Sequence, residues 1–181
     1  MNSQLLYYSI LVLIIGGIKT DILYYQPEQV HISYGSNLYE IAVTWSTFSA
    51  TNGSIVEYGI RGMILRAEGS ERLFVDGGAN KHFQYIHRVI LKDLQPGSRY
   101  EYHCGSTLGW SDIFFFNTPP DSDAWVPHIA LFGDMGNENA QSLVRLQEEA
   151  QRGMYDTILH VGDFAYDMDS VNYQNVRLLS V

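Results

Sequence analysis

The stretch Ile129-Ala-Leu-Phe-Gly-Asp-Met-Gly136 joins a short apolar run to a Gly-Asp turn, and the pattern returns at Thr157-Ile-Leu-His-Val-Gly-Asp163. Apolar runs of this length, without alternating polar residues, are typical of parallel strands covered on both faces. The residues between them repeat apolar side chains at helical spacing, with Asn137 or Asn139 as the expected N-cap and Gly153 at the expected C-terminal end. The sequence therefore predicts a strand, a helix and a second strand that pairs in parallel with the first.

Asp134 and Asp163 each follow one of these predicted strands and are 29 positions apart (163 − 134). Neighbouring parallel strands end at the same edge of a sheet, so we expect the two carboxylates to lie close together there. Two carboxylates in one crevice repel each other unless a cation lies between them, and carboxylate oxygens are ligands of hard metal ions. One carboxylate can bridge two metals, and two-metal sites suit displacement at phosphorus. The alternative is that these turns only cap the segments that follow them.

Two further side chains lie near the second turn. Tyr166 comes three residues after Asp163 and is expected to reach the same place, where its phenolate would be a ligand for ferric iron. The alternative for Tyr166 is a packed loop aromatic. His160 lies inside the strand, and we expect its ring to hydrogen-bond a carbonyl instead of binding a metal. The other histidines show no metal-ligand spacing and are expected to be structural or exposed; they are His31, His82, His87, His103 and His128.

Residues 24–118 show a different pattern, in which short strand-like runs are separated by Gly, Asn or Pro turns. The run Glu40-Ile-Ala-Val-Thr-Trp-Ser46 alternates clearly, with Ile41, Val43 and Trp45 on one face. The expected strands are residues 30–34, 40–46, 54–58, 63–67, 73–75, 85–91, 99–104 and 113–116. Their number and spacing predict an all-β sandwich, followed by a linker at residues 119–125.

Residues 1–20 contain an almost unbroken apolar run, which is too short for a stable membrane span and is typical of a signal peptide. An uncleaved anchor and a buried first strand are the alternatives. The sequon at Asn52 predicts N-glycosylation and agrees with a secreted or lysosomal protein. Cys104 is the only cysteine, so no disulfide forms within the chain, and we expect this side chain to be buried in a strand. The net charge of −9 argues against nucleic acid as a partner.

Three motifs resemble known families. Leu94-Gln-Pro-Gly-Ser-Arg-Tyr-Glu-Tyr102 is similar to the fibronectin type III pattern, in which a Leu-x-Pro-Gly turn leads into a strand with a core tyrosine. Gly133-Asp-Met-Gly136, followed by Gly162-Asp-Phe-Ala-Tyr-Asp167, resembles the first two motif blocks of the purple acid phosphatases, within the metallophosphoesterase superfamily. The resemblance implies a fibronectin type III-like sandwich at residues 24–118 and the first βαβ portion of an α/β metallophosphoesterase domain at residues 126–181.

The same resemblance implies the chemistry of the site. Asp134 would bind a ferric ion, Asp163 would bridge it to a divalent iron, zinc or manganese ion, and Tyr166 would bind the ferric ion and give these enzymes their colour. The family's reaction is hydrolysis of phosphate monoesters at acidic pH. The later motif blocks, which supply an asparagine and several histidines, do not follow Asp167. We therefore expect metal ligands but no catalytic residue in this chain, and no activity of the chain alone.

Two other functions remain open at the level of the sequence. A non-catalytic secreted binding module would use the β-sandwich alone. Another metallophosphoesterase, such as a dimanganese phosphodiesterase, would use the same two aspartates, although such enzymes generally lack the tyrosine that stands at Tyr166 in this chain.

Overall fold

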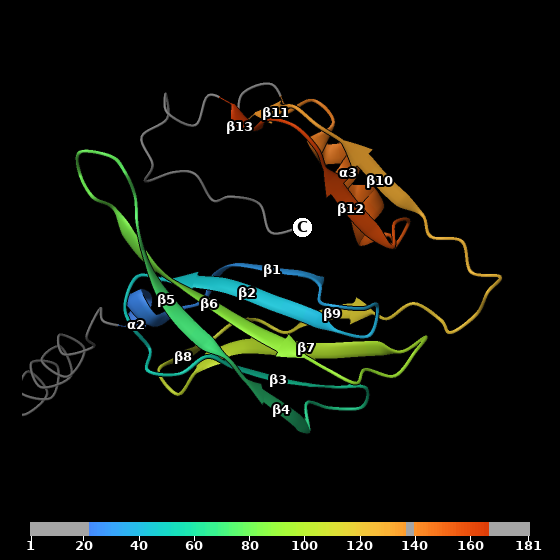
Figure 1. Ribbon diagram of the computed structural model, residues 1–181, viewed down its shortest axis with the longest axis horizontal. Coiled ribbons are helices and arrows are strands. Elements are labelled where there is room, and N and C mark those ends of the chain that lie inside the picture. The colour runs from blue at the N-terminus through green and yellow to red at the C-terminus, as the bar shows by residue number, and fades with distance from the viewer. Residues whose placement is uncertain (1–21, 137–139, 167–181) are drawn as a thin grey trace, which may run out of the picture.

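The computed structural model describes residues 22–136 and 140–166. Between residues 28 and 117 the chain forms two antiparallel β-sheets that face each other (Figure 1). The first sheet has the order β1 (Glu28–Tyr34), β2 (Ile41–Thr47), β6 (Phe83–Leu91) and β5 (Ser70–Val75). The second has the order β4 (Leu65–Glu68), β3 (Ile55–Gly59), β7 (Arg99–Ser106) and β8 (Gly109–Trp110), with β9 (Phe114–Asn117) also paired to β7. A one-turn helix, α2 (Ile22–Tyr25), precedes them. The expected sandwich of β-strands is confirmed.

The core between the sheets follows from the alternation of apolar residues along the central strands. Strand β2 turns Ile41, Val43 and Trp45 inward, and Trp45 is only 1% exposed. Strand β7 of the other sheet contributes Tyr100 and Tyr102. The same core contains Val30, Val56, Tyr58, Val89, Leu91, Leu94, Cys104 and Phe116. Burying one large apolar side chain contributes about 1.5–3 kcal/mol, so this core is the main source of the sandwich's stability.

Strand β4 begins two residues later than the sequence suggests. We expected a strand at residues 63–67, but β4 begins at Leu65, because residues 60–64 form the turn that joins it to β3. The Ile64 backbone N–H donates to the Gly62 carbonyl at 3.0 Å, and a Cβ at Gly59 would meet the same carbonyl oxygen. This tight turn leaves the Ile64 side chain in solvent, which the apolar run did not predict.

Tyr100 fastens the Leu-x-Pro-Gly turn to the sandwich. Its hydroxyl accepts a hydrogen bond from the Gln95 backbone N–H at 2.9 Å, and its ring stacks on Phe116 with centroids 5.3 Å apart. Gly97, at φ +58, takes the left-handed conformation that glycine adopts without strain. A tyrosine bonded to the backbone a few residues upstream is the tyrosine corner of immunoglobulin-like sandwiches. The expected core tyrosine of this motif is therefore present.

Cys104 lies on β7 with no exposed surface, as the sequence predicted. Burial raises the pKa of its thiol to about 12, and a hydrogen bond with Ser111 has a smaller, opposite effect. The thiolate is the reactive form of cysteine, so this side chain is an inert part of the core.

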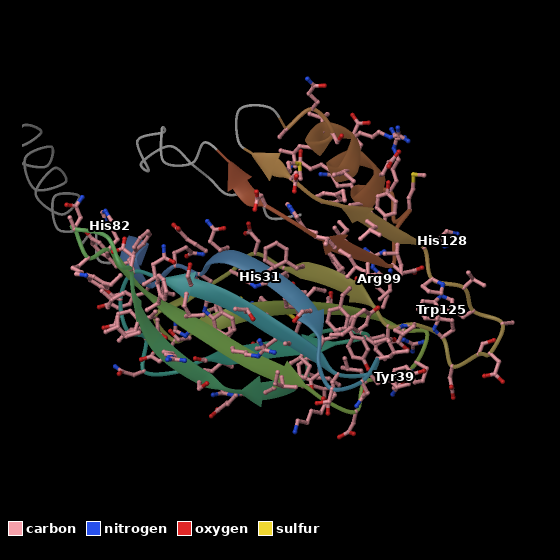
Figure 2. All side chains as sticks on the ribbon, turned by 45° about the horizontal axis from the view of Figure 1, so that its top comes forward. His31, Tyr39, His82, Arg99, Trp125 and His128 are labelled. Carbon is pink, nitrogen blue, oxygen red and sulfur yellow. The ribbon has the colours of Figure 1, made fainter. Side chains whose placement is uncertain are left out.

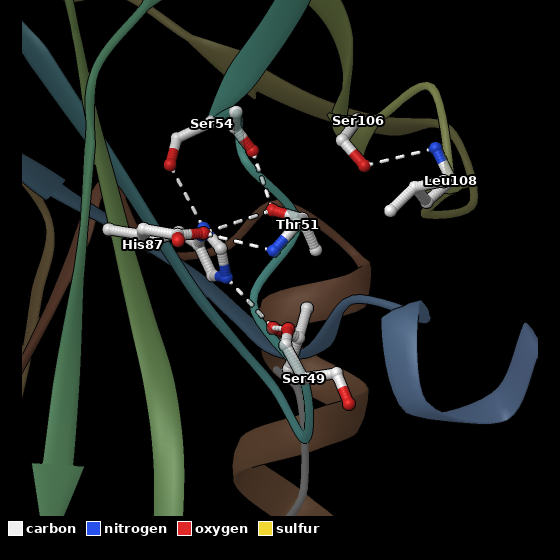
Figure 3. Close-up of polar contacts among 9 residues, drawn as sticks. Ser49, Thr51, Ser54, His87, Ser106 and Leu108 are labelled. Carbon is white, nitrogen blue, oxygen red and sulfur yellow. Dashed lines mark hydrogen bonds and ion pairs between the residues drawn. The ribbon is translucent and has the colours of Figure 1, made fainter. Parts of the chain in front are cut away.

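A buried histidine, His87 on β6, connects the first sheet to the loop before β3 (Figure 3). Thr47 Oγ1 lies 2.9 Å from His87 Nε2 and donates its own proton to the Ser49 carbonyl at 2.7 Å. Nε2 must therefore carry the hydrogen that Thr47 accepts, and Nδ1 accepts from the Ser54 hydroxyl at 2.9 Å. Both ring nitrogens are satisfied when the imidazole is neutral.

The surroundings of His87 also favour the neutral ring. The ring stacks on Trp45 with centroids 5.0 Å apart and an interplanar angle of 5°. Glu71 Oε2 lies 3.9 Å from Nδ1 and accepts a hydrogen bond from the Thr51 backbone N–H at 3.1 Å. Burial lowers the pKa of His87, and the Glu71 carboxylate opposes this shift without cancelling it.

After β9 the chain passes through residues 118–128, which hold no helix or strand, into a smaller unit (Figure 1). This unit consists of β10 (Ile129–Phe132), β11 (Met135–Gly136), α3 (Leu143–Gln151), β12 (Thr157–His160) and β13 (Phe164–Tyr166). Strands β10 and β12 pair in parallel, and β11 and β13 form a second short parallel pair. No helix within the described ranges has both the length and the apolar composition to cross a membrane.

Helix α3 begins later than the sequence predicted. Its N-cap is Ser142, whose side chain makes no capping hydrogen bond, whereas Asn137 and Asn139 lie outside the described residues. The reason is a turn before the helix, in which the Leu143 backbone N–H donates to the Ala140 carbonyl at 3.0 Å.

The C-terminal end of α3 is where the sequence placed it. Gly153 has φ +70, and its backbone N–H donates to the Ala150 carbonyl at 2.9 Å. The Met154 backbone N–H donates to the Glu149 carbonyl at 3.0 Å, which completes a Schellman arrangement. The role of Gly153 as the C-terminal glycine is confirmed.

The lowered pKa of His87 makes the sandwich less stable in acid. The unfolded state takes up a proton near pH 6.5, whereas the folded state binds it only at lower pH, so the free energy of unfolding decreases as pH falls below about 6.5. We expect His87→Gln to flatten this decrease by up to about 1.4 kcal/mol per pH unit. Urea unfolding at several pH values between 7 and 5 measures how the free energy of unfolding changes with pH. The exposed His31, replaced by Gln, is the matched control, and a wild-type slope in His87→Gln would contradict the assignment.

Removing the Tyr100 hydroxyl should loosen the turn without disturbing the core. Tyr100→Phe keeps the stacked ring but leaves the Gln95 N–H without its acceptor, so we expect a loss of about 1 kcal/mol in the free energy of unfolding. Chemical denaturation checks this value. Tyr39→Phe, which removes a hydroxyl at the edge of the same core, is the control and should change stability much less.

Candidate metal centre

The two predicted aspartate turns lie side by side at the ends of β10 and β12. Phe132 is the register partner of His160, and the Val161 backbone N–H donates to the Phe132 carbonyl at 2.7 Å. Gly133 follows Phe132 directly and Gly162 follows Val161, so both turns leave the sheet at the same edge.

Gly133 allows the two turns to touch. A Cβ at this position would meet the Val161 carbonyl oxygen, which occupies the space that a side chain would need. The absence of a side chain at Gly133 thus gives room to the backbone of the other turn.

The Asp134 carboxylate is bound by the second turn. Asp134 has φ +55, a left-handed conformation that aspartate tolerates better than most residues. Its Oδ1 accepts a hydrogen bond from the Asp163 backbone N–H at 3.1 Å. Gly162 has φ +100, and a Cβ there would lie only 2.5 Å from the same Oδ1. The structure therefore brings Asp134 and Asp163 together across 29 residues of chain.

The Asp163 carbonyl is held as well. It accepts hydrogen bonds from the Met135 backbone N–H and from His160 Nε2, each at 3.2 Å. The expected hydrogen bond of His160 to a carbonyl is confirmed. The sequence did not show which carbonyl this would be, because the contact depends on how sharply the chain turns at Gly162.

Tyr166 lies on β13, where its backbone is the register partner of Gly136 on β11. The Tyr166 backbone therefore lies beside Gly136, which is two residues after Asp134 in the sequence. Its role as a metal ligand stays a prediction.

The described donors fit a hard metal ion in kind. Asp134 and Asp163 are both exposed and offer carboxylate oxygens, the donor type that ferric and divalent ions accept. Asp134 Oδ1 fits against the second turn because Gly162 has no side chain. Within residues 22–136 and 140–166, however, no group of three or more His, Cys, Asp or Glu side chains gathers around one point. The candidate ligands whose side chains the structure describes are therefore Asp134 and Asp163.

The remaining histidines lie elsewhere in the described part of the chain. In Figure 2, His82 lies at one end of the molecule and His128 near the smaller unit, with His31 on the sandwich between them. His103 Nε2 lies 2.9 Å from Glu57 Oε2 on the sandwich surface. None of them joins the aspartate turns in the described part of the chain.

Comparisons with known proteins identify relatives of this chain. A family model described as the N-terminal domain of purple acid phosphatase matches residues 27–118. Proteins named acid phosphatase type 7 are 53% identical over 146 residues in Danio rerio and 46% identical over 149 residues in Homo sapiens. A protein from Arabidopsis thaliana named Fe(3+)-Zn(2+) purple acid phosphatase 12 is 28% identical over 153 residues.

These three matches cover 79%, 81% and 83% of this chain, but only 33%, 34% and 32% of the relatives. The chain thus spans about a third of the length of the curated relatives it matches. Among solved structures, a purple acid phosphatase from seeds of yellow lupin (Lupinus luteus) aligns with a TM-score of 0.63 and 24% identity. That alignment covers 78% of this chain and 30% of the lupin chain, and it supports the fold.

Filling the space at Gly133 should separate the two turns. In Gly133→Ala the new methyl group meets the Val161 carbonyl, so we expect the Val161 amide to lose its protection and the unit to lose on the order of 2 kcal/mol. Residue-specific amide hydrogen exchange measures this change. Gly77→Ala is the matched control, because a Cβ at Gly77 has no neighbour within 4 Å. Equal Val161 exchange in both variants would contradict the close approach.

Proposed function

Because the chain belongs to the purple acid phosphatase family, we propose that it supplies part of a dinuclear metal centre that hydrolyses phosphate monoesters at acidic pH. The observation that carries the proposal is the contact between the two turns, in which the Asp163 N–H lies 3.1 Å from Asp134 Oδ1. This contact joins the two residues to which the family resemblance gives metal-binding roles.

Each of the three proposed ligands has its own part. Asp134 would bind the ferric ion through its carboxylate, Asp163 would bridge the ferric and the divalent ion, and Tyr166 would bind the ferric ion through its phenolate. When bound, the metal pair supplies Lewis-acid activation for displacement at phosphorus. The residues of this chain contribute negative charge and fixed positions: the left-handed Asp134 and the bonded Asp163 backbone restrict where the carboxylate oxygens can lie.

The divalent metal of the pair is iron, zinc or manganese in this proposal. The Arabidopsis thaliana relative is named for ferric iron and zinc, which favours zinc among the three. A carboxylate that bridges two ions suits any of them, because all accept oxygen ligands.

The proposal extends to the organisation of the chain. Residues 24–118 would form the N-terminal domain, residues 119–125 the linker, and residues 126–181 the first portion of the metallophosphoesterase domain. Residues 1–20 would act as a signal peptide that directs the protein to secretion or to the lysosome. The Asn52 side chain is exposed in a turn at φ +55, which agrees with its proposed glycosylation.

Replacing either aspartate by its neutral isostere tests the proposal in the complete protein. We expect Asp134→Asn and Asp163→Asn to lose bound iron and visible absorbance, and to lower phosphate monoester hydrolysis at least about 100-fold. Metal analysis, the absorption spectrum and a p-nitrophenyl phosphate assay at pH 5 measure these three quantities.

The control is Asp121→Asn, which removes the same charge from an exposed position in the linker. It should keep the iron, the colour and the activity of the wild type. Retention of iron and activity in both site variants would show that the metal centre lies elsewhere.

A further inference from the structure

We infer that His160 is a positioning residue of the two aspartate turns: its Nε2–H holds the Asp163 main chain, and with it both carboxylates, in place. The inference rests on the proposed function only for its purpose, because the contacts themselves are formed by residues of this chain. It concerns a side chain that touches neither metal nor substrate in the proposed site.

Among the described residues, three hydrogen bonds converge on the backbone of Asp163. Its N–H donates to Asp134 Oδ1 at 3.1 Å, and its carbonyl accepts from the Met135 N–H and from His160 Nε2, each at 3.2 Å. Two of these bonds come from the first turn and tie the turns to each other. The third hydrogen bond is donated by the His160 side chain on β12, the strand that leads into the second turn.

The chemistry of the partner fixes the protonation of the ring. A carbonyl oxygen only accepts hydrogen bonds, so Nε2 of His160 must carry the proton in this contact. The ring also packs against Phe132, its register partner on β10, with centroids 4.9 Å apart and planes tilted by 51°. Packing thus holds the imidazole in the orientation that points its N–H at the turn.

Gly162 explains why a side chain at position 160 can reach the carbonyl of residue 163. Gly162 has φ +100, and the Asp163 carbonyl that follows it lies 3.2 Å from His160 Nε2. The same conformation brings the Asp163 N–H to Asp134 Oδ1, and a Cβ at Gly162 would lie 2.5 Å from that oxygen. The His160 bond therefore holds closed a turn that only glycine forms without strain.

The consequence for the metal site is a fixed relation between two carboxylates. Since Oδ1 of Asp134 already accepts the Asp163 N–H, the carboxylate cannot rotate freely, and the Asp163 side chain projects from the same restrained residue. A centre arranged in this way loses less conformational entropy when the ions bind than two free carboxylates would.

Amide hydrogen exchange in the metal-free protein tests the inference directly. In His160→Leu, which fills a similar space without a donor, we expect the Asp163 and Met135 amides to exchange about tenfold faster, the effect of losing one hydrogen bond. In His160→Gln, whose Nε2 can donate as the imidazole does, we expect both rates to stay within about twofold of the wild type. The Val161 amide, bonded to Phe132 in the sheet, should be unchanged in both variants.

The matched control is His128→Leu, which makes the same substitution at a largely exposed ring in the same unit. It should leave the Asp163 and Met135 amides as they are. Wild-type rates in His160→Leu, or equally fast rates in His160→Leu and His160→Gln, would overturn the inference. If His160→Leu does not fold, the long-range 1H–15N spectrum of the wild-type imidazole decides: a proton on Nε2 supports the inference, and a proton on Nδ1 alone overturns it.

Iron content of the wild type separates this inference from the proposed function. Protected Asp163 and Met135 amides in a protein that binds no iron would leave the role of His160 standing and end the proposal of a metal centre. Iron binding in a protein whose Asp163 and Met135 amides are unprotected would support the metal centre and end the role proposed for His160.

Discussion

The hydrogen bond from the Asp163 N–H to Asp134 Oδ1 is the contact on which the candidate centre depends. It requires two turns from different parts of the chain to approach more closely than side chains normally allow. Gly133 permits that approach, because the Val161 carbonyl oxygen occupies the place that a Cβ would take. Gly162 permits it as well, because a Cβ there would collide with Asp134 Oδ1. The parallel pairing of β10 and β12 supplies the register that puts the turns at one edge. Backbone geometry, more than any single charged residue, thus creates the site.

The sandwich has a different physical basis. Its two sheets close over aromatic and aliphatic side chains that alternate along β2, β6 and β7. Two polar side chains then fix segments that the core alone would leave loose: Tyr100 holds the turn before β7, and His87 holds the loop before β3 (Figure 3). The match of the family model to residues 27–118 concerns this part of the chain. Family membership therefore rests on the sandwich and on the identity with relatives, whereas the proposed metal chemistry rests on the two turns.

Much of the fold could be predicted from local pattern. The alternation of Ile41, Val43 and Trp45 predicted their common inward face, and the apolar runs before Gly133 and Gly162 predicted strands that pair in parallel. Patterns of this kind work because the side-chain period of a strand is fixed by its backbone. The predicted start of α3 was wrong, since the residues from Ala140 to Ser142 form a turn before the helix begins at Leu143.

Contacts between distant parts of the chain were beyond such patterns. His87 occupies an inward position that its strand period predicts, but its hydroxyl partners come from β2 and from the loop before β3. The partner of Gly133 is likewise a carbonyl 28 residues away (161 − 133), so the sequence showed a glycine but not what it makes room for. The nearness of Asp134 and Asp163 could be predicted because it follows from strand pairing. The hydrogen bonds that restrain them depend on left-handed conformations at Asp134 and Gly162, which the sequence does not specify.

The central claim is that these two turns hold metal ions, and anomalous scattering at the iron absorption edge tests it most directly. Crystals of the complete protein, purified with its metals, should show an iron peak between the turns, within about 2.0–2.2 Å of carboxylate oxygens of both Asp134 and Asp163. An iron peak coordinated by other residues, or no iron between the turns in a catalytically active crystal, would contradict the claim.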